Sequence, residues 1–230
     1  MRIVPSGVGI VAIVSTAAEN LARYVRSLPN FAIHESGSYN HMGATIADAV
    51  LQANMKYSTH VEPRMNRILV QYPEARTISA LVRLLSSISV KDFLSWRGED
   101  RCQRFARIVR LFESEGIDTE ADLRSWLAQD ANREKLRSIK GIGPKTIDYF
   151  KILVGESTSA IDRHLLGFLK LAGIEAASYR EAQDVINATA DLLGIDRAHF
   201  DYSIWQFMSK GLSSCGTYEV APTKAEGATP

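Results

Sequence analysis

Residues 136–164, LRSIKGIGPKTIDYFKILVGESTSAIDRH, contain the pattern that is most informative about the fold. At its centre Gly141, Ile142 and Gly143 separate two runs in which apolar residues repeat at helical spacing. Two glycines around one apolar residue permit a tight turn with left-handed backbone torsions, and Ile142 can enter the core between the two helices. The sequence therefore predicts a helix-hairpin-helix near residues 131–155. The apolar residues on its inner side are Leu136, Ile139, Ile147 and Phe150.

The hairpin also has the features of a phosphate-binding site. Pro144 suits the first turn of a helix, where its missing N–H costs nothing, and the other N–H groups of that turn point outward. Between Arg133 and Lys170 basic residues outnumber acidic ones by eight to four, although the whole chain carries a net charge of only +1. We therefore expect sequence-independent binding to the DNA backbone, with an ordinary helical turn as the alternative. The expected contacts are Lys140, Gly141, Ile142, Gly143 and Thr146.

Outside this stretch the hydrophobic pattern predicts an all-α protein. Three of the expected helices end at glycines, namely Gly173, Gly194 and Gly211. The tail, residues 216–230, has a composition typical of a disordered segment. We expect a loop over residues 30–43 and helices over 44–53, 61–72, 78–86, 90–96, 99–114, 120–129, 162–171, 179–193 and 197–210.

The N-terminal segment has a pattern of its own. Residues 8–14 are apolar and faintly resemble a signal peptide, but one basic residue precedes them and Pro5 interrupts the run. The run is also too short to span a bilayer, so we expect a buried strand or an extended arm. The capping-box sequence that begins at Thr16 predicts the start of the first helix, which should end before Pro29.

Composition limits the classes of protein to be considered. A chain of 230 residues suits one large domain or two small ones. Cys102 and Cys215 lie far apart and form no CxxC pair, which argues against a disulfide framework, a zinc site and an iron–sulfur cluster. Two scattered cysteines are typical of a protein in the reducing cytoplasm.

Two motifs of the decisive stretch resemble a known family. Residues 140–146, KGIGPKT, followed after a spacer by residues 160–164, AIDRH, resemble the signature of the helix-hairpin-helix (HhH-GPD) DNA glycosylases. Endonuclease III and 8-oxoguanine glycosylase belong to this superfamily. In the family a lysine opens the helix after the hairpin and an aspartate follows at a similar interval to the one here, where Asp162 comes seventeen residues after Lys145.

The resemblance extends more weakly to both sides. Residues 46–53, IADAVLQA, resemble an early helix of the family that ends in a glutamine, and residues 200–205, FDYSIW, resemble its closing helix. The similarity thus covers residues 44–210, of which only residues 139–164 are specific.

The resemblance implies a two-lobed helical fold with a DNA cleft between the lobes. Residues 44–155 would form an internal lobe with the hairpin, and residues 1–43 plus 156–215 would form the second lobe. Two departures from the family pattern are Lys140, where a proline is usual, and the missing four-cysteine motif of the endonuclease III branch. The second departure points to the branches without a cluster, which include the 8-oxoguanine and alkyl-base enzymes.

The two residues expected to perform chemistry are Asp162 and Lys145. Breaking a glycosidic bond builds positive charge on the sugar, which a carboxylate such as Asp162 can stabilise. Its alternative role is a plain helix N-cap. Lys145 lies in a helix N-terminus, whose positive end favours a neutral amine, so it can attack the sugar, form a Schiff base and lead to β-elimination. Its alternative role is to bind a phosphate.

Other candidate residues have weaker support. Gln52 is expected to fill the space that a flipped base leaves in the duplex, or else to be a surface residue at a helix end. His164 and Tyr149 are expected to pack or to contact phosphate, and Trp126 and Trp205 are expected in the core. Asp48 could contact a base, but no pattern supports that role.

The leading hypothesis is a bifunctional DNA glycosylase and AP lyase that excises a damaged or mismatched base from double-stranded DNA. The alternatives are a monofunctional glycosylase and a non-catalytic helix-hairpin-helix module that only binds DNA. We expect a cytoplasmic monomer, nucleoid-associated in a bacterium or archaeon, without membrane contact. We expect no cofactor and no iron–sulfur cluster, although a monovalent or divalent cation could bind at the hairpin.

Overall fold

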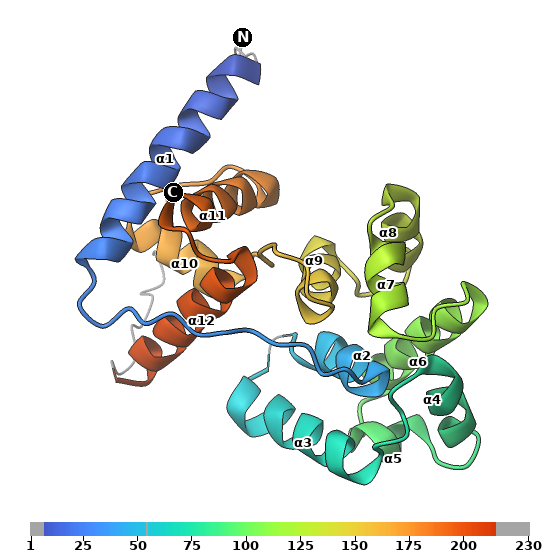
Figure 1. The fold of residues 1–230 in the computed structure, drawn as a ribbon. Helices are drawn as coiled ribbons and strands as arrows, with labels where there is room; N and C mark the ends of the chain where they lie inside the picture. Colours follow the sequence, from blue (N-terminus) through green and yellow to red (C-terminus); the bar gives the residue numbers. More distant parts are fainter. Residues whose placement is uncertain (1–6, 54, 215–230) are drawn as a thin grey trace, which may run out of the picture.

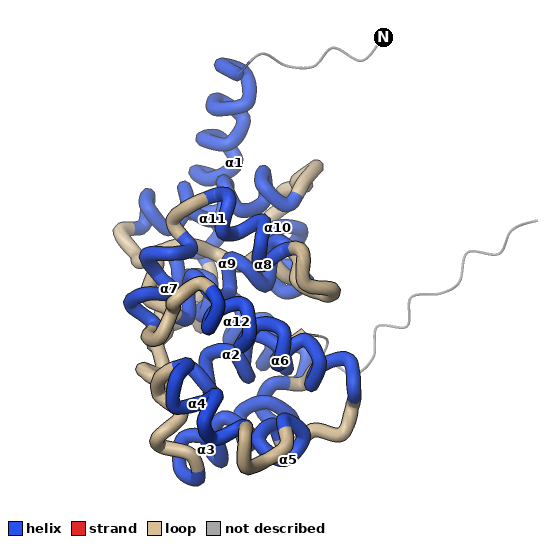
Figure 2. The backbone as a smooth tube through the Cα atoms, turned by 90° about the vertical axis from the view of Figure 1, so that its right-hand side faces the viewer, coloured by secondary structure: helices blue, strands red, loops and turns tan. Residues whose placement is uncertain are grey.

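The computed structural model describes the backbone of residues 7–53 and 55–214 and the side chains of residues 13–53 and 55–210. In these residues the protein is entirely helical, which confirms the all-α prediction (Figures 1 and 2). The helices are α1 (Gly7–Ser27), α2 (Met42–Leu51), the π-helical turn η1 (Tyr57–Val61), α3 (Glu62–Gln71), α4 (Ile78–Leu85), α5 (Val90–Leu94), α6 (Glu99–Ser114), α7 (Glu120–Leu127), α8 (Asp130–Arg137), α9 (Pro144–Leu153), α10 (Arg163–Leu171), α11 (Tyr179–Leu193) and α12 (Arg197–Ser214).

The N-terminal segment differs from the prediction. Its described part, from Gly7, is the first part of the long helix α1, so the expected strand or extended arm is wrong. Thr16 lies inside this helix and does not cap it. The physical reason is that no proline lies between Gly7 and Ser27 and a single glycine, Gly9, does not end a helix, so the apolar run and the amphipathic run that follows form one continuous helix.

The C-terminal helix also differs from its predicted end. α12 continues through Gly211 to Ser214, because one glycine costs only about 1 kcal/mol in a helix and does not by itself end it. Cys215 and the tail that we expected to be disordered lie outside the described residues. None of the described helices is long and apolar enough to cross a membrane.

The buried apolar side chains form two main clusters. The first cluster runs from Met42 to Val154 and is built by helices α2 to α9. The second combines Leu21 and Val25 of α1 with side chains of α10, α11 and α12. Figure 1 shows the corresponding two groups of helices, with α9 between them. The chain therefore leaves the second group after α1 and returns to it after α9.

Helix α2 is the centre of the first cluster. All of its residues, Met42 to Leu51, are buried, and it packs against α6 and α9. Its N-terminal end also lies close to α5 and to the segment before α4, because a Cβ at Gly43 would press on Phe93 and on the backbone of Ala75. Because the helix is held on all sides, its C-terminal end is fixed relative to the N-terminus of α9.

Candidate active site

The hairpin between α8 and α9 lies where the sequence predicts it. The Ile142 N–H donates to the Ile139 carbonyl at 3.0 Å, and the Ile142 side chain is buried in the first cluster. Only Gly141 has a left-handed torsion, with φ of +88°, whereas Gly143 is extended with φ of −113°. The expectation of left-handed torsions is therefore correct for one of the two glycines. Pro144 occupies the start of α9, as expected.

The hairpin leaves backbone donors free. Among the described residues, no acceptor lies on the backbone N–H groups of Gly141, Gly143 and Lys145. The N–H of Thr146 is already bound to the Gly143 carbonyl at 3.1 Å, so its hydroxyl is the group left for a ligand. Lys140 is exposed beside the turn. Free N–H groups at the positive end of a helix favour an anion such as a phosphate.

Two arginines of α6, which the sequence analysis did not single out, lie at the same surface. Arg104 donates from Nε to the Lys140 carbonyl at 2.9 Å, and Arg101 donates from Nη2 to the Ala53 carbonyl at 2.6 Å. Burial, and then the charge of Arg104, lower the pKa of Arg101. Within the described residues neither guanidinium is paired with a carboxylate, so their mutual repulsion is not offset by an ion pair. Their positions one turn apart on α6 give no motif that could have identified them.

Lys145 projects from the first turn of α9 toward residues that are distant in sequence. Its Nζ lies 3.6 Å from Oδ2 of Asp162 and 3.5 Å from Oε1 of Gln52. The Lys145 side chain is 35% exposed and that of Asp162 is 14% exposed, so the pair is accessible from one side only. The three residues predicted from separate motifs are thus close neighbours.

Asp162 is the N-cap of α10. Its Oδ1 accepts from the backbone N–H of His164 at 2.7 Å and of Leu165 at 3.1 Å. Burial alone would raise its pKa, but the hydrogen bond from His164 and the charge of Lys145 outweigh this effect and hold the pKa of Asp162 below its usual value. The capping role and a charged role thus use different oxygens, because Oδ2 faces Lys145 and Nδ1 of His164.

Beside Lys145 lies a buried acid that the sequence analysis could not support. Oδ2 of Asp48 accepts from the hydroxyls of Tyr39 and Tyr149, each at 2.9 Å, while Oδ1 is buried without a partner in the described structure. Burial raises the pKa of Asp48 to about 6, although the tyrosine hydroxyls and the charge of Lys145 act in the opposite direction. Asp48 precedes Gln52 by one helical turn, so both side chains lie on the same face of α2. This spacing is the one sequence feature that relates Asp48 to Gln52.

The two tryptophans have different positions. Trp126 is buried in the first cluster, as predicted. Trp205 is only partly buried and stacks on Tyr202 with its ring centroid 6.0 Å away, so its assignment to the core is wrong. Its ring also meets the edges of Tyr57 and His164. Trp205 therefore places an aromatic surface next to His164, whose Nδ1 lies 3.2 Å from Oδ2 of Asp162.

This arrangement combines the elements of nucleophilic catalysis. An amine lies against one carboxylate that stays charged, and near a second, Asp48, which can hold a proton near neutral pH. The free hairpin amides and Arg104 lie next to the same helix N-terminus. Such a site can bind an anionic backbone and present an amine to an electrophilic carbon. No group of metal-ligating side chains occurs among the described residues.

Comparison with known proteins gives one match. Neither the curated proteins nor the solved structures contain a match to this chain. A family model described as a domain of unknown function (DUF8548) matches residues 94–209. This range begins at the end of α5 and includes the hairpin, Lys145 and Asp162, but not Asp48 or Gln52. Because the match covers half of the chain, the protein belongs to the DUF8548 family.

Proposed function

We propose that this protein is a DNA glycosylase with AP lyase activity, which excises a damaged or mismatched base from double-stranded DNA. The observation that carries this proposal is the 3.6 Å approach of Lys145 Nζ to Asp162 Oδ2 in a partly exposed site. A module that only binds DNA through its hairpin has no need of this pair. The proposed fold is the two-lobed helical fold of the HhH-GPD superfamily, with the DNA bound between the two groups of helices.

The proposed reaction begins with extrusion of the target nucleotide from the duplex, which costs a few kcal/mol. Gln52 would fill the vacated space and hydrogen-bond to the orphaned base. Arg101 donates to the carbonyl of Ala53, the residue after Gln52, and this hydrogen bond fixes the backbone next to Gln52. A rigid support of this kind reduces the entropy lost when the side chain enters the duplex.

The chemical step needs a neutral amine. The Asp162 carboxylate accepts a proton from Lys145, and Nζ then attacks C1′ of the sugar while the base leaves with the electron pair of the glycosidic bond and takes up a proton. The product is an N,O-acetal at C1′; its C1′–O4′ bond then opens, O4′ takes up a proton, and the nitrogen lone pair forms the imine. The imine loses a proton from C2′, and the 3′ phosphate leaves by β-elimination. Water finally hydrolyses the imine and returns Lys145. The proton that Asp162 accepts passes to the leaving base, and the carboxylate, charged again, stabilises the positive charge that develops on the sugar.

Binding to the DNA backbone would use the hairpin and α6 together. The free N–H groups of Gly141 and Gly143 and the guanidinium of Arg104 lie around one turn, which suits a phosphate. Phosphate contacts do not depend on the base sequence, so this surface would hold any duplex. Selection of the base would depend on the residues around Lys145.

Borohydride trapping tests the proposal. A covalent imine must exist during turnover, and borohydride reduces it to a stable amine that survives denaturation. The parent protein should be trapped on a duplex with a suitable lesion, and Lys145→Gln should lose both trapping and strand nicking. Lys170→Gln removes an exposed lysine from the last turn of α10 and serves as the matched control, with trapping retained.

The outcomes separate the three hypotheses. Loss of trapping in Lys145→Gln alone supports the glycosylase/lyase. Base release without trapping by the parent protein would indicate a monofunctional glycosylase, with Lys145 as a phosphate ligand. Neither base release nor trapping across a panel of single-lesion duplexes, together with intact DNA binding, would favour the binding module.

A further inference from the structure

The segment that leads from α9 to Asp162 is held residue by residue. Ser159 donates from its hydroxyl to Oδ1 of Asn187 at 2.8 Å, and its carbonyl accepts from Gln183 at 2.7 Å. The next N–H, of Ala160, donates to Oδ2 of Asp201 at 2.8 Å. Ser159 and Ala160 are buried, and backbone groups in such a segment need partners inside the protein. These bonds fix the path of the chain immediately before the candidate catalytic carboxylate.

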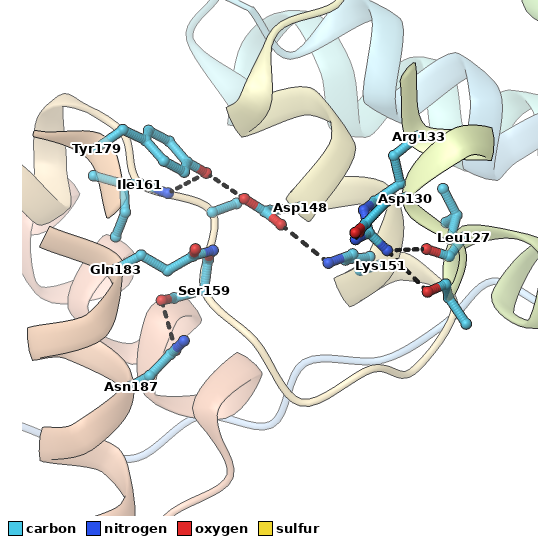
Figure 3. A network of polar contacts seen from close by, with 12 residues as sticks. Leu127, Asp130, Arg133, Asp148, Lys151, Ser159, Ile161, Tyr179, Gln183 and Asn187 are labelled. Atoms are coloured by element: carbon cyan, nitrogen blue, oxygen red, sulfur yellow. Dashed lines mark hydrogen bonds and ion pairs between the residues drawn. The ribbon is translucent and has the colours of Figure 1, made fainter. Parts of the chain in front are cut away.

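The third residue of the segment is bound through a tyrosine. The Ile161 N–H donates to the Tyr179 hydroxyl at 3.3 Å, and this hydroxyl donates to Oδ2 of Asp148 at 2.7 Å (Figure 3). Oδ1 of Asp148 lies 3.5 Å from Lys151. Burial and the charge of Asp148 raise the pKa of Tyr179, so its hydroxyl keeps the proton that it donates. The donor and the acceptor are therefore defined for both hydrogen bonds of Tyr179.

This chain of bonds joins the two members of the candidate catalytic pair. Asp148 follows Lys145 by three residues on α9, so both lie on the same face of that helix. Ile161 directly precedes Asp162. One hydroxyl from α11 thus connects the helix that carries the amine to the backbone that carries the carboxylate. A small apolar cluster of Ile152 from α9, Ala160 and Ala198 from α12 joins the same two groups of helices.

We propose that Tyr179 is a positioning residue, which acts together with Asp148 and Asp201. These residues fix the position of the Asp162 carboxylate next to the ammonium group of Lys145. The proposal rests on the proposed function, because it assigns these residues to the same site. Tyr179 does not touch the substrate. It acts by fixing the Ile161 N–H relative to α9, and a shift of about 1 Å in a catalytic group can cost about 100-fold in rate.

The test compares two reactions of one variant, Tyr179→Phe. Excision of a base needs both Asp162 and Lys145, whereas imine formation on DNA with a preformed abasic site needs the lysine but no glycosidic bond cleavage. We expect single-turnover excision by Tyr179→Phe to fall 10- to 100-fold, within the range that removal of a positioning contact produces. Borohydride trapping on the abasic duplex should stay within about threefold of the parent, because the abasic aldehyde reacts with Lys145 without cleavage of a glycosidic bond, the step in which the charge of Asp162 matters most.

A purely structural role would give a different pattern. Loss of folded protein lowers excision and trapping by the same factor. Thr189→Val is the matched control, because it removes a buried hydroxyl from the same helix as Tyr179 but from a place where its partners are the carbonyls of Ala18 and Val185. Its melting temperature should fall about as much as that of Tyr179→Phe, while its excision rate stays near that of the parent.

Two variants of Asp201 provide a conservative rescue. Asp201→Asn keeps an oxygen that can accept from Ala160 and should keep most of the excision activity, whereas Asp201→Ala should lose it. The inference is overturned if Tyr179→Phe excises at the parent rate, or if it loses excision and abasic trapping equally. If the parent protein itself shows neither activity, the proposed function fails and this inference fails with it.

Discussion

Three carboxyl groups near Lys145 have different environments and therefore different tasks. Asp162 is capped by backbone N–H groups and stays charged, whereas burial raises the pKa of Asp48 to about 6 and that of Asp201 to about 8. The charge of Asp162 adds to the rise at Asp201. Near neutral pH Asp201 therefore holds a proton, Asp48 lies close to the range in which it titrates, and Asp162 stays charged beside the amine.

Replacement of Asp162 by Asn should separate its two roles. The amide oxygen can still cap α10, but the charge that faces Lys145 is lost. We expect base excision to fall by about 100-fold or more, as for the loss of an electrostatic stabiliser, and DNA affinity to be kept or improved. Quench-flow excision and fluorescence anisotropy measure the two effects. Excision close to the parent rate would reduce Asp162 to a helix cap.

The raised pKa of Asp201 predicts how stability depends on pH. Between the ordinary carboxyl pKa, near 4, and its folded value of about 8, the folded protein binds one proton more than the unfolded chain at this residue. The free energy of unfolding therefore decreases as pH rises through this range. Asp201→Asn removes the effect, so its stability relative to the parent should be greater at pH 8 than at pH 5. Urea denaturation of both proteins at both pH values measures their difference in the free energy of unfolding. The same difference at pH 5 and pH 8 would contradict the burial of the Asp201 carboxyl group.

At the scale of the element, the hairpin assigns different tasks to its two glycines. A Cβ at Gly141 would overlap the guanidinium of Arg104, and the φ of +88° is strained for any other residue. A Cβ at Gly143 would meet nothing within 4 Å. An extended backbone before a proline is also open to all residues. Gly141 therefore serves the fold, whereas the space at Gly143 is available to a ligand.

Replacement of Gly143 by Leu should affect binding without affecting folding. We expect an unchanged melting temperature and a weaker affinity for every duplex alike, because the side chain would enter the space beside the free N–H groups. Gly37→Leu adds the same side chain at another glycine where a Cβ would meet nothing within 4 Å and is the control. By contrast, Gly141→Ala should lower the free energy of unfolding by about 1–3 kcal/mol. A loss of affinity for one lesion only would mean that the hairpin belongs to the base site.

Helix α6 yields a prediction about salt dependence. If Arg104 contacts a phosphate, Arg104→Gln should reduce the slope of log affinity against log salt by about one unit. Arg110→Gln removes the same charge from an exposed position about 120° around α6 from Arg104 and should leave the slope nearly unchanged. Titrations at several salt concentrations measure both slopes. Equal reductions in the two variants would indicate only a general effect of net charge.

At the scale of the whole molecule, the two ends of the described chain share one cluster. Helix α1 packs on α11, and the Thr189 hydroxyl donates to the Ala18 carbonyl at 3.3 Å. Leu21 of α1 is fully buried among side chains of the C-terminal helices. The second cluster therefore needs both ends of the chain, whereas the first is built from one continuous stretch.

Truncation of Leu21 should reveal whether the clusters are separate units of stability. Leu21→Ala should lower the free energy of unfolding by about 2–5 kcal/mol through the cavity that it leaves. Hydrogen exchange should become faster in α10, α11 and α12, while the amides of α6 and α7 keep their protection. An equal increase throughout the protein would show that both clusters unfold as one cooperative unit.

Local sequence patterns were sufficient to predict the helical class, the hairpin and several helix boundaries. The helix predicted at 99–114 matches α6, and that at 179–193 matches α11, because caps and helical periodicity are local properties. Lys145 and Asp162 were identifiable for the same reason, since each lies in a short motif. These motifs, however, contain no information on the distance between the two side chains.

The residues that surround Lys145 and Asp162 could be identified only from the three-dimensional fold. Asp48, Arg104 and Tyr179 come from three helices, and no spacing in the sequence relates them to Lys145. The continuous helix α1 and its packing on α11 were also missed, because its apolar run does not indicate what covers it. Burial, raised pKa values and hydrogen bonds between distant residues depend on packing in three dimensions, and local sequence patterns describe only neighbours along the chain.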